Sequence, residues 1–512
     1  MSMRNKMKKY FYVTTPIYYP SGNLHIGHTY TTTLADVIAR FKKEMGCEVF
    51  FLTGSDEHGQ KIEQKAKQEN KTPKEYVDDI VETFKDLWTK LDISYDKFIR
   101  TTDQEHIIAV QKIFSLLLKK DLIYLSKYKG KYCISCEEFL TKEQMDENCH
   151  HNVCKNKAED FQEETYMLRV SQFKEYLNNL FSTDFLEPSS RKNEMLNNFI
   201  NNDLEDLSVT RINFKWGIEV LENPNHVIYV WLDALSNYIT ALGWGTDNDE
   251  NFNKFWFDES EILQLVGKEI TRFHSIYWPI MLNSLGLRTP DKLLSHGWIL
   301  SKDTKMSKSL GNVINPLEII EKYSSDALRF YIVNNLPTDK DGNFTEELFI
   351  ESYNTNLANN VGNLLSRVSN MIIKYFDGIL PETLPAQDNE LLELAEKTIT
   401  AYVAKMNEYK FNEAINVVLN LSSECNRYIE QVKPWVLEKE GNTNELLKTL
   451  TILRHNILII SFLLKPILTK NYDNMIRQMG ADPKEIKFDT LTKRNFKFEQ
   501  IKEKLIIFDR IK

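Results

Sequence analysis

The first part of the chain alternates short apolar runs with amphipathic segments. Residues 10–15 and 48–53 are rich in aromatic and β-branched side chains, which predicts buried strands. Residues 75–91 place apolar side chains at helical spacing, which predicts an amphipathic helix. Alternation of these two patterns is typical of an α/β fold with a parallel sheet.

The alternating pattern is interrupted in the middle of the chain and then resumes. Between residues 118 and 222 the apolar runs shorten around a group of cysteines, whereas 226–231 and 263–267 again predict strands. We therefore expect an insertion that splits one α/β domain into two halves. From about residue 353 the spacing is helical, which predicts a helical bundle. The expected segments are 1–117, 118–222, 223–295, 296–352 and 353–512.

Composition and charge narrow the class of protein. The 512 residues are 42% hydrophobic, which predicts a folded protein with more than one core. The longest apolar run, 456–464, is too short to cross a bilayer and predicts a buried helix. The basic N-terminus lacks an apolar secretion segment, so we expect a cytoplasmic protein without a membrane partner. A net charge of −9 argues against nonspecific coating of nucleic acid but allows a local groove.

Four of the six cysteines are clustered at a spacing compatible with tetrahedral zinc. Cys133 and Cys136 form a C-x2-C pair, and Cys149 and Cys154 form a looser C-x4-C pair. We expect one structural zinc ion on these four cysteines, with His150 or His151 as substitutes for Cys154. A degenerate knuckle without metal is the alternative.

Two short motifs that lie far apart in the chain are both suited to binding phosphate. The His-Ile-Gly-His run at 25–28 joins a predicted strand to a predicted helix, where backbone N–H groups and the helix dipole attract anions. Its glycine leaves room for a ligand, and its imidazoles can donate to phosphate oxygens. The Lys-Met-Ser-Lys-Ser run at 305–309 places two ammonium groups three residues apart in a loop. The two motifs together predict a polyphosphate site.

Three further segments have the polarity of a ligand pocket. Residues 16–19 follow the first predicted strand, and 231–238 and 270–278 would each, as helices, place aromatic and apolar side chains on one face. A single stripe of this kind is more often core packing. Asp56 lies just past the second strand and adds a carboxylate that can pair with a substrate ammonium group. Doubly wound sheets bind ligands at this edge, so we expect a pocket there.

Taken in this order, the two phosphate motifs resemble the signature pair of class I aminoacyl-tRNA synthetases. The resemblance extends along nearly the whole chain, and the pocket segments are most similar to the methionine-specific family. It implies a Rossmann-like doubly wound parallel sheet, split by a zinc-knuckle insertion and followed by a helical anticodon-binding domain. The implied enzyme activates L-methionine with ATP and Mg²⁺ and transfers it to the 3′ end of tRNA(Met).

The resemblance also implies roles for individual residues. The methionine side chain would lie among Ile17, Tyr19, Trp231, Ala234, Tyr238, Ile270 and His274, with Asp56 on the α-amino group. The groups that act on the triphosphate would be His25, His28, Lys305 and Lys308. Further contacts to the nucleotide would come from Gly27, Glu269, Gly297, Trp298 and Ser309. Aromatic edges and weakly polar groups suit a polarizable thioether.

Residues of the helical region look like the anticodon readers of that family. Asn363 and Arg367 lie one helical turn apart and can bond to base edges, and the Trp435 ring can stack on a base. The chain carries no appended β-barrel RNA-binding module of the kind with which some relatives dimerise. We therefore expect a monomer whose partners are tRNA(Met), L-methionine and ATP.

Two other classes of function are compatible with parts of the sequence. A nucleotidyltransferase acting on a small metabolite would share the first motif, but the helical region with Asn363 and Trp435 argues against it. A non-enzymatic RNA-binding or partner-binding protein could keep the scaffold, yet it would be free to lose the histidines and lysines that are intact here.

Overall fold

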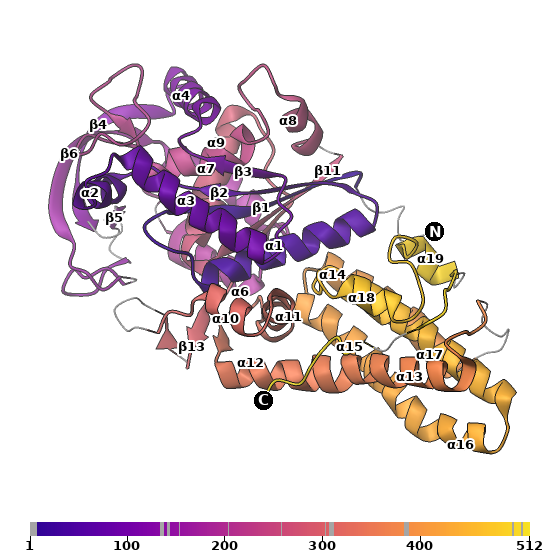
Figure 1. Ribbon diagram of the computed structural model, residues 1–512. Coiled ribbons are helices and arrows are strands. Elements are labelled where there is room, and N and C mark those ends of the chain that lie inside the picture. The colour runs from indigo at the N-terminus through magenta and orange to yellow at the C-terminus, as the bar shows by residue number, and fades with distance from the viewer. Residues whose placement is uncertain are drawn as a thin grey trace. The chain divides into compact units, whose positions relative to one another are not determined.

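The computed structural model describes residues 8–133, 138–140, 144–152, 154–202, 204–257, 259–302, 304–306, 312–382, 389–493, 496–502 and 505–512. The chain forms two compact units, and each contains several separate stretches of sequence (Figure 1). The first unit comprises Met1–Leu24, Glu48–Asp86 and Ser94–His296, and the second comprises His25–Cys47, Leu87–Ile93 and Gly297–Lys512. The five segments expected from the sequence stay predictions.

The first unit is built on a six-stranded parallel sheet. Its order is β3 (Lys97–Arg100), β2 (Glu48–Ser55), β1 (Tyr10–Tyr18), β11 (Ser260–Gly267), β12 (Lys292–His296) and β7 (Leu186–Glu187). Val13 at the centre of β1 pairs with Phe51 on one side and Leu263 on the other. Strand order therefore reverses between β1 and β11. Sheets of this kind bind ligands in the crevice at the carboxyl ends of the strands on either side of such a reversal. The predicted α/β class with a parallel sheet is confirmed.

Helices and one large apolar core complete the first unit. The helices are α2 (Gln60–Gln68), α3 (Pro73–Lys90, whose last turn belongs to the second unit), α4 (Gln104–Lys119), α5 (Lys174–Phe181), α6 (Ser189–Met195), α7 (Val230–Thr240), α8 (Glu250–Phe255) and α9 (Trp278–Leu285). Tyr12, Val110, Leu235 and Trp278 all belong to this core, so strands and helices share one buried cluster.

The inserted region forms its own antiparallel sheet. The sheet has the order β5 (Glu138–Leu140), β4 (Ile123–Cys133), β6 (Glu159–Leu168) and β8 (Leu207–Ser208). A separate ribbon pairs β9 (Thr210–Arg211) with β10 (Val227–Ile228). The strand expected at 226–231 is therefore only partly correct, since β10 covers two residues outside the main sheet and α7 starts at Val230.

The second unit is mainly helical. Its helices are α1 (Ile26–Glu44), α10 (Pro316–Lys322), α11 (Ser325–Asn335), α12 (Glu346–Ser352), α13 (Asn363–Phe376), α14 (Glu390–Asn407), α15 (Phe411–Val432), α16 (Pro434–Lys439), α17 (Thr443–Leu464), α18 (Tyr472–Arg477) and α19 (Phe488–Lys493). A small sheet orders β14 (Thr304–Lys305), β13 (Ile299–Ser301) and β15 (Gly342–Phe344). α17 is long and apolar enough to cross a membrane, but 89% of its most apolar window is buried inside the protein. The predicted buried helix at 456–464 is confirmed.

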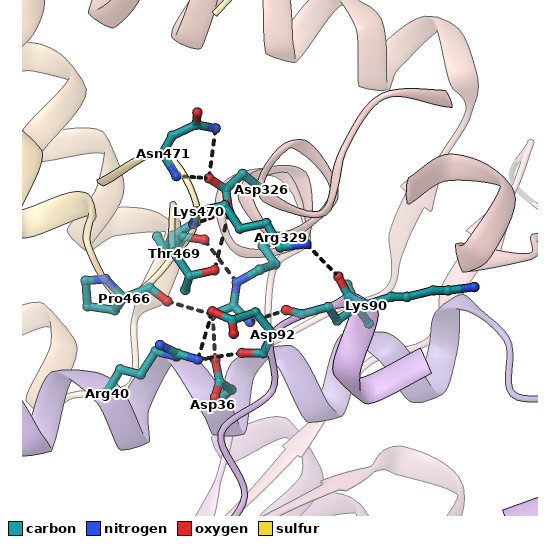
Figure 2. Close-up of polar contacts among 12 residues, drawn as sticks. Asp36, Arg40, Lys90, Asp92, Asp326, Arg329, Pro466, Thr469, Lys470 and Asn471 are labelled. Atoms are coloured by element: carbon teal, nitrogen blue, oxygen red, sulfur yellow. Dashed lines mark hydrogen bonds and ion pairs between the residues drawn. The ribbon is translucent and has the colours of Figure 1, made fainter. Parts of the chain in front are cut away.

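A buried ion pair joins distant parts of the second unit (Figure 2). Arg329 on α11 is fully buried and pairs with Asp36 on α1 at 2.6 Å. The same guanidinium donates to the carbonyls of Leu91, Pro466 and Ile467 at 3.2, 2.7 and 3.0 Å. One side chain thus links α1, the segment after α3, α11 and the α17–α18 connection.

Candidate active site

The carboxyl ends of three adjacent strands define one edge of the first unit. β1 ends at Tyr18, β2 at Ser55 and β11 at Gly267, so the residues that follow them emerge at the same edge. Asp56 is 8% exposed, and its N–H donates to the carbonyl of Tyr18 at 3.0 Å. The carboxylate expected at a strand end is therefore located at the reversal of strand order.

Helix α7 and His274 form a hydrogen-bonded wall beside this edge. The Tyr12 hydroxyl donates to the carbonyl of Tyr238 at 2.7 Å, which ties α7 to β1. The Tyr238 hydroxyl lies 2.7 Å from His274 Nε2, and His274 Nδ1 lies 2.9 Å from the carbonyl of Ile270. Burial lowers the pKa of His274 to about 4. The neutral ring therefore donates from Nδ1 and accepts the tyrosine proton at Nε2.

Most of the apolar residues expected in the pocket pack into one cluster. Ile17, Trp231 and Ile270 are half-buried against the core that contains Tyr238. The Trp231 ring stacks on Phe273, with centroids 3.4 Å apart and planes 9° apart. Two expected members lie differently: Ala234 is buried on α7, and Tyr19 packs against the separate cluster Ile62, Ala66, Tyr76 and Val77.

The segment 270–278 is not the regular helix that would place Ile270, His274 and Trp278 on one face. A 3₁₀ turn at Lys268–Ile270 is followed by a π-helical stretch at Phe273–Tyr277, and α9 starts at Trp278. The wider π-helical turn changes which residues share a face, so the expected face of Ile270, His274 and Trp278 is distorted. π-helical stretches often occur at functional sites.

The loop after β2 carries a buried polar group that the sequence reading missed. His58 Nδ1 lies 2.7 Å from Asp233 Oδ2, and His106 Nε2 lies 2.8 Å from Asp233 Oδ1. All three side chains are buried. The available signal was the run of ionisable residues 56–58 directly after a buried strand, but its partners on α4 and α7 are far away in sequence.

The first phosphate motif is folded as the N-terminus of α1 in the second unit. His25 Nδ1 accepts the N–H of Gly27 at 3.1 Å, and His28 Nδ1 accepts the N–H of His25 at 3.0 Å. Since both Nδ1 atoms accept, each neutral ring carries its proton on Nε2 and can donate it to an anion. A Cβ on Gly27 would lie 2.9 Å from His25 Cε1, so a larger residue at this position would displace the His25 ring.

The second motif is only partly described. Thr304–Lys305 forms β14, in which Lys305 pairs with Leu300, whereas Lys308 and Ser309 lie outside the described residues. A Cβ on Gly297 would lie 2.2 Å from the carbonyl of Lys340, so close backbone packing accounts for that glycine.

Two other nucleotide candidates lie at well-defined backbone positions. The N–H of Trp298 donates to Asp341 at 2.9 Å within the second unit. In the first unit, Glu269 folds back over the strand end, where a Cβ on Gly267 would lie 2.6 Å from its carboxylate oxygens.

Two cysteine sulfurs and one imidazole nitrogen meet in the insertion. Cys133 Sγ and Cys154 Sγ lie 3.4 Å apart, and Cys154 Sγ lies 3.4 Å from His151 Nδ1. The three ligand atoms all lie within 4.8 Å of one another, and Cys149 is not part of this group as far as the described residues show. Zn–S bonds of about 2.3 Å and a tetrahedral arrangement fit these separations. Cys136 lies outside the described residues.

The three expected anticodon readers lie in the helical part of the second unit. Asn363 Nδ2 on α13 lies 3.2 Å from Asn426 Oδ1 on α15, and Arg367 pairs with Glu430 at 2.6 Å one turn further. Trp435 is the second residue of α16, with 41% of its surface exposed.

Comparison with known proteins identifies the class of this site. The protein-family model described as "tRNA synthetases class I (M)" matches residues 11–160 and 147–369 of the chain. A second family model, described as "Anticodon-binding domain of tRNA ligase", matches residues 388–489. The chain is thus that of a class I tRNA synthetase with an anticodon-binding domain.

Relatives at higher similarity define the family within that class. Methionine–tRNA ligase of Enterococcus faecalis (strain ATCC 700802 / V583) is 48% identical over 499 residues, 94% of this chain and 74% of that protein. The Bacillus subtilis (strain 168) protein is 46% identical, covering 94% and 75%. A structure of Mycobacterium tuberculosis methionyl-tRNA synthetase with methionyl-adenylate has a TM-score of 0.93 at 31% identity, covering 98% of this chain and 100% of that one. The chain belongs to the methionine–tRNA ligase family.

Proposed function

We propose that the chain activates L-methionine with ATP and transfers it to the 3′ end of tRNA(Met). The methionine carboxylate attacks the α-phosphorus of ATP, the bond to the β-phosphate breaks, and pyrophosphate leaves. A hydroxyl of the terminal adenosine then attacks the activated carbonyl, loses its proton and displaces AMP. The observation that carries this proposal is the carboxyl edge of the sheet in a chain of this family: Asp56 follows β2 there, His274 bonds to Tyr238, and Trp231 packs against the same core as Tyr238.

The amino-acid site combines one carboxylate with an apolar wall. Asp56 holds the α-ammonium group, and the thioether lies against Trp231, Tyr238 and His274. The remaining lining residues are Ile17, Tyr19, Ala234 and Ile270. Sulfur gains from contact with aromatic edges, and the neutral His274 ring offers a polar edge without a charge.

Donors around the phosphates carry the first step. A carboxylate is already a nucleophile at neutral pH, so the step needs positioning and charge stabilisation rather than a base. His25 and His28 donate to the triphosphate from Nε2, and Lys305 and Lys308 supply positive charge. The proposed nucleotide contacts are Gly27, Glu269, Gly297, Trp298 and Ser309. Mg²⁺, held mainly by the phosphates, would neutralise further charge.

The helical unit reads the tRNA. Asn363 and Arg367 bond to the edges of anticodon bases and Trp435 stacks on one of them. Because Arg367 is paired with Glu430 in the free chain, reading a base through Arg367 requires that ion pair to open.

The insertion binds one structural zinc ion. Cys133, His151 and Cys154 are the proposed ligands, with Cys136 as the fourth, and the separations given above support this set. Cys149, a ligand in the set predicted from sequence, is replaced in this proposal by His151. We also propose that the enzyme works in the cytoplasm as a monomer. Sedimentation of the purified chain tests the monomeric state.

Single-turnover adenylate formation tests the phosphate assignment. His28→Asn keeps an acceptor for the N–H of His25 but removes the Nε2 donor, and Lys308→Ala removes one positive charge. We expect both to slow adenylate formation by about 10²–10³-fold while methionine binding is retained. Trp435→Ala is the matched control, with normal activation and reduced charging of tRNA. Unchanged single-turnover rates in both phosphate variants would contradict the assignment.

A further inference from the structure

The loop that carries Asp56 is fixed at four consecutive positions by four different partners. Three backbone N–H groups donate hydrogen bonds: Asp56 to Tyr18 O at 3.0 Å, Glu57 to Thr101 Oγ1 at 2.9 Å, and Gly59 to Trp216 O at 3.0 Å. The fourth hydrogen bond is made by a side chain, from His58 Nδ1 to Asp233 Oδ2 at 2.7 Å. The Trp216 indole also donates back to the carbonyl of Glu57 at 2.6 Å. This loop is therefore held far more tightly than a surface connection.

His58 bonds to the carboxylate of Asp233, which lies on α7 and is fully buried. Burial alone would raise the pKa of Asp233, but the nearby charge of His58 and hydrogen bonds from His106 and His58 hold it below its usual value. The carboxylate is thus ionised and accepts from both imidazoles. His106 in turn places its Nδ1 2.7 Å from the hydroxyl of Thr240.

The hydrogen bond between His58 and Asp233 connects the two ends of the proposed amino-acid site. Tyr18, Thr101 and Trp216 tie the loop to other parts of the first unit, whereas Asp233 belongs to α7 and lies between the pocket residues Trp231 and Ala234. This hydrogen bond therefore joins the loop of Asp56 directly to α7, in addition to the separate hydrogen bonds that each makes to β1.

We infer that the His58–Asp233 hydrogen bond positions Asp56 relative to α7 and thereby selects the length of the amino-acid substrate. This inference rests on the proposed function, in which Asp56 holds the α-ammonium group and α7 the side chain. His58 is a positioning residue, since it acts through Asp56 and not on the substrate.

Selection by length needs such a fixed distance. An apolar pocket alone distinguishes substrates that differ by one methylene by only about 10- to 200-fold. A substrate held at both ends fits best at one spacing, so S-methylcysteine is too short and ethionine too long. A small displacement of one end changes the rate strongly, by about 10²-fold for 1 Å.

A variant of His106 is a matched control for the variant of His58, because it shows what the loss of a hydrogen bond to Asp233 does to the stability of the fold alone. His106 is buried like His58 and bonds to the other oxygen of the same carboxylate, but it lies on α4 and not on the loop of Asp56. His58→Leu and His106→Leu each remove one hydrogen bond from Asp233. A role confined to holding the fold together predicts similar effects from both.

The test is methionine-dependent ATP–pyrophosphate exchange by the full chain. We expect His58→Leu to lower kcat/KM for methionine about tenfold, equivalent to about 1.4 kcal/mol, and to reduce its preference over ethionine and S-methylcysteine. His106→Leu should keep both values. Inhibition by 4-(methylthio)butanoate, which lacks the amino group, should be unchanged in both variants. His58→Asn places an amide nitrogen near the Nδ1 position and should restore the preference, whereas His58→Gln should not.

Equal losses in the His58 and His106 variants would overturn the inference, as would a parallel loss of 4-(methylthio)butanoate binding. If His58→Leu does not fold, the comparison of His58→Asn with His58→Gln decides, and equal preference in the two would also overturn it. Failure of the proposed function is a separate result, because the unsubstituted chain would then show no exchange with methionine.

Discussion

A neutral imidazole in the pocket wall is the residue-scale feature with the clearest chemical consequence. Burial lowers the pKa of His274 to about 4, and its two nitrogens are matched to the carbonyl of Ile270 and the hydroxyl of Tyr238. A protonated ring could no longer accept from the Tyr238 hydroxyl, so this hydrogen bond would have to reverse, with Nε2 donating to the hydroxyl oxygen. In the proposed site, this part of the wall therefore offers the substrate side chain a dipole and no charge.

This burial predicts a pH dependence of stability. An unfolded histidine takes up its proton near pH 6.5, whereas folded His274 does so only near pH 4. The unfolded state is thus favoured increasingly as the pH falls between these values, by about 3 kcal/mol in total. We expect urea midpoints to fall from pH 7 to pH 4.5, and to fall less in His274→Gln. Equal pH dependence in both proteins would contradict this assignment.

Residue-scale chemistry could be predicted from the sequence where it follows an element boundary. The expected positions are confirmed for Asp56, which comes directly after β2, and for His25 and His28, which lie at the start of α1. The roles of these residues stay predictions. His58, Asp233 and His106 could not be paired in this way, because buried polar partners on separate elements leave no periodic signal.

At the scale of elements, the cysteine-bearing end of the insertion has only a small apolar cluster of its own, whereas Ile123, Leu168 and Leu177 of the same insertion belong to the large core of the first unit. Leu140 and Ala158 are the buried residues beside Cys133 in the small cluster, with Met145 and Cys154 packed against them. A metal ion is the expected substitute for a larger core in so small a region.

Removal of the metal tests this account of the insertion. We expect about one zinc ion per purified chain, and chelation should increase hydrogen exchange in β4 and β6. Cys133→Ser and Cys154→Ser should lose the ion, whereas Cys149→Ser should keep it because Cys149 lies outside the group of ligand atoms. Purified protein without zinc, or exchange unaffected by chelation, would contradict a structural site.

Element boundaries were predictable where spacing is regular. The expected strand at 48–53 is β2 (Glu48–Ser55), and the expected helix at 75–91 is α3 (Pro73–Lys90). The segment 270–278 was not, because its π-helical stretch departs from the 3.6-residue period on which the prediction depends.

At the scale of the whole chain, distant segments of the second unit depend on the ion pair of Asp36 and Arg329. Both side chains are fully buried. Removing Asp36 leaves the Arg329 charge without a carboxylate, whereas removing Arg329 leaves Asp36 with only the half-buried Arg40 at 2.8 Å and leaves three carbonyls without their donor. We expect Arg329→Met or Asp36→Leu to destabilise this unit by about 3–5 kcal/mol, and the double variant by less than the sum. Denaturant unfolding of the unsubstituted chain, the two single variants and the double variant gives the double-mutant cycle. Additive losses would contradict direct coupling of the pair.

The order of elements along the chain was predictable, but the division into compact units was not. The sequence separates catalytic and helical regions by position, whereas α1 and the segment Leu87–Ile93 belong to the same unit as the C-terminal helices. Contacts such as those of Arg329 with Leu91 and Ile467 produce this grouping, and they are invisible to local patterns.

The central claim is that the chain activates methionine, and ATP–pyrophosphate exchange with each of the twenty amino acids in turn, without tRNA, tests it most directly. The account predicts exchange with methionine alone. Exchange with a different amino acid would contradict the assignment of the pocket, and no exchange with any amino acid would contradict the proposed activation reaction itself.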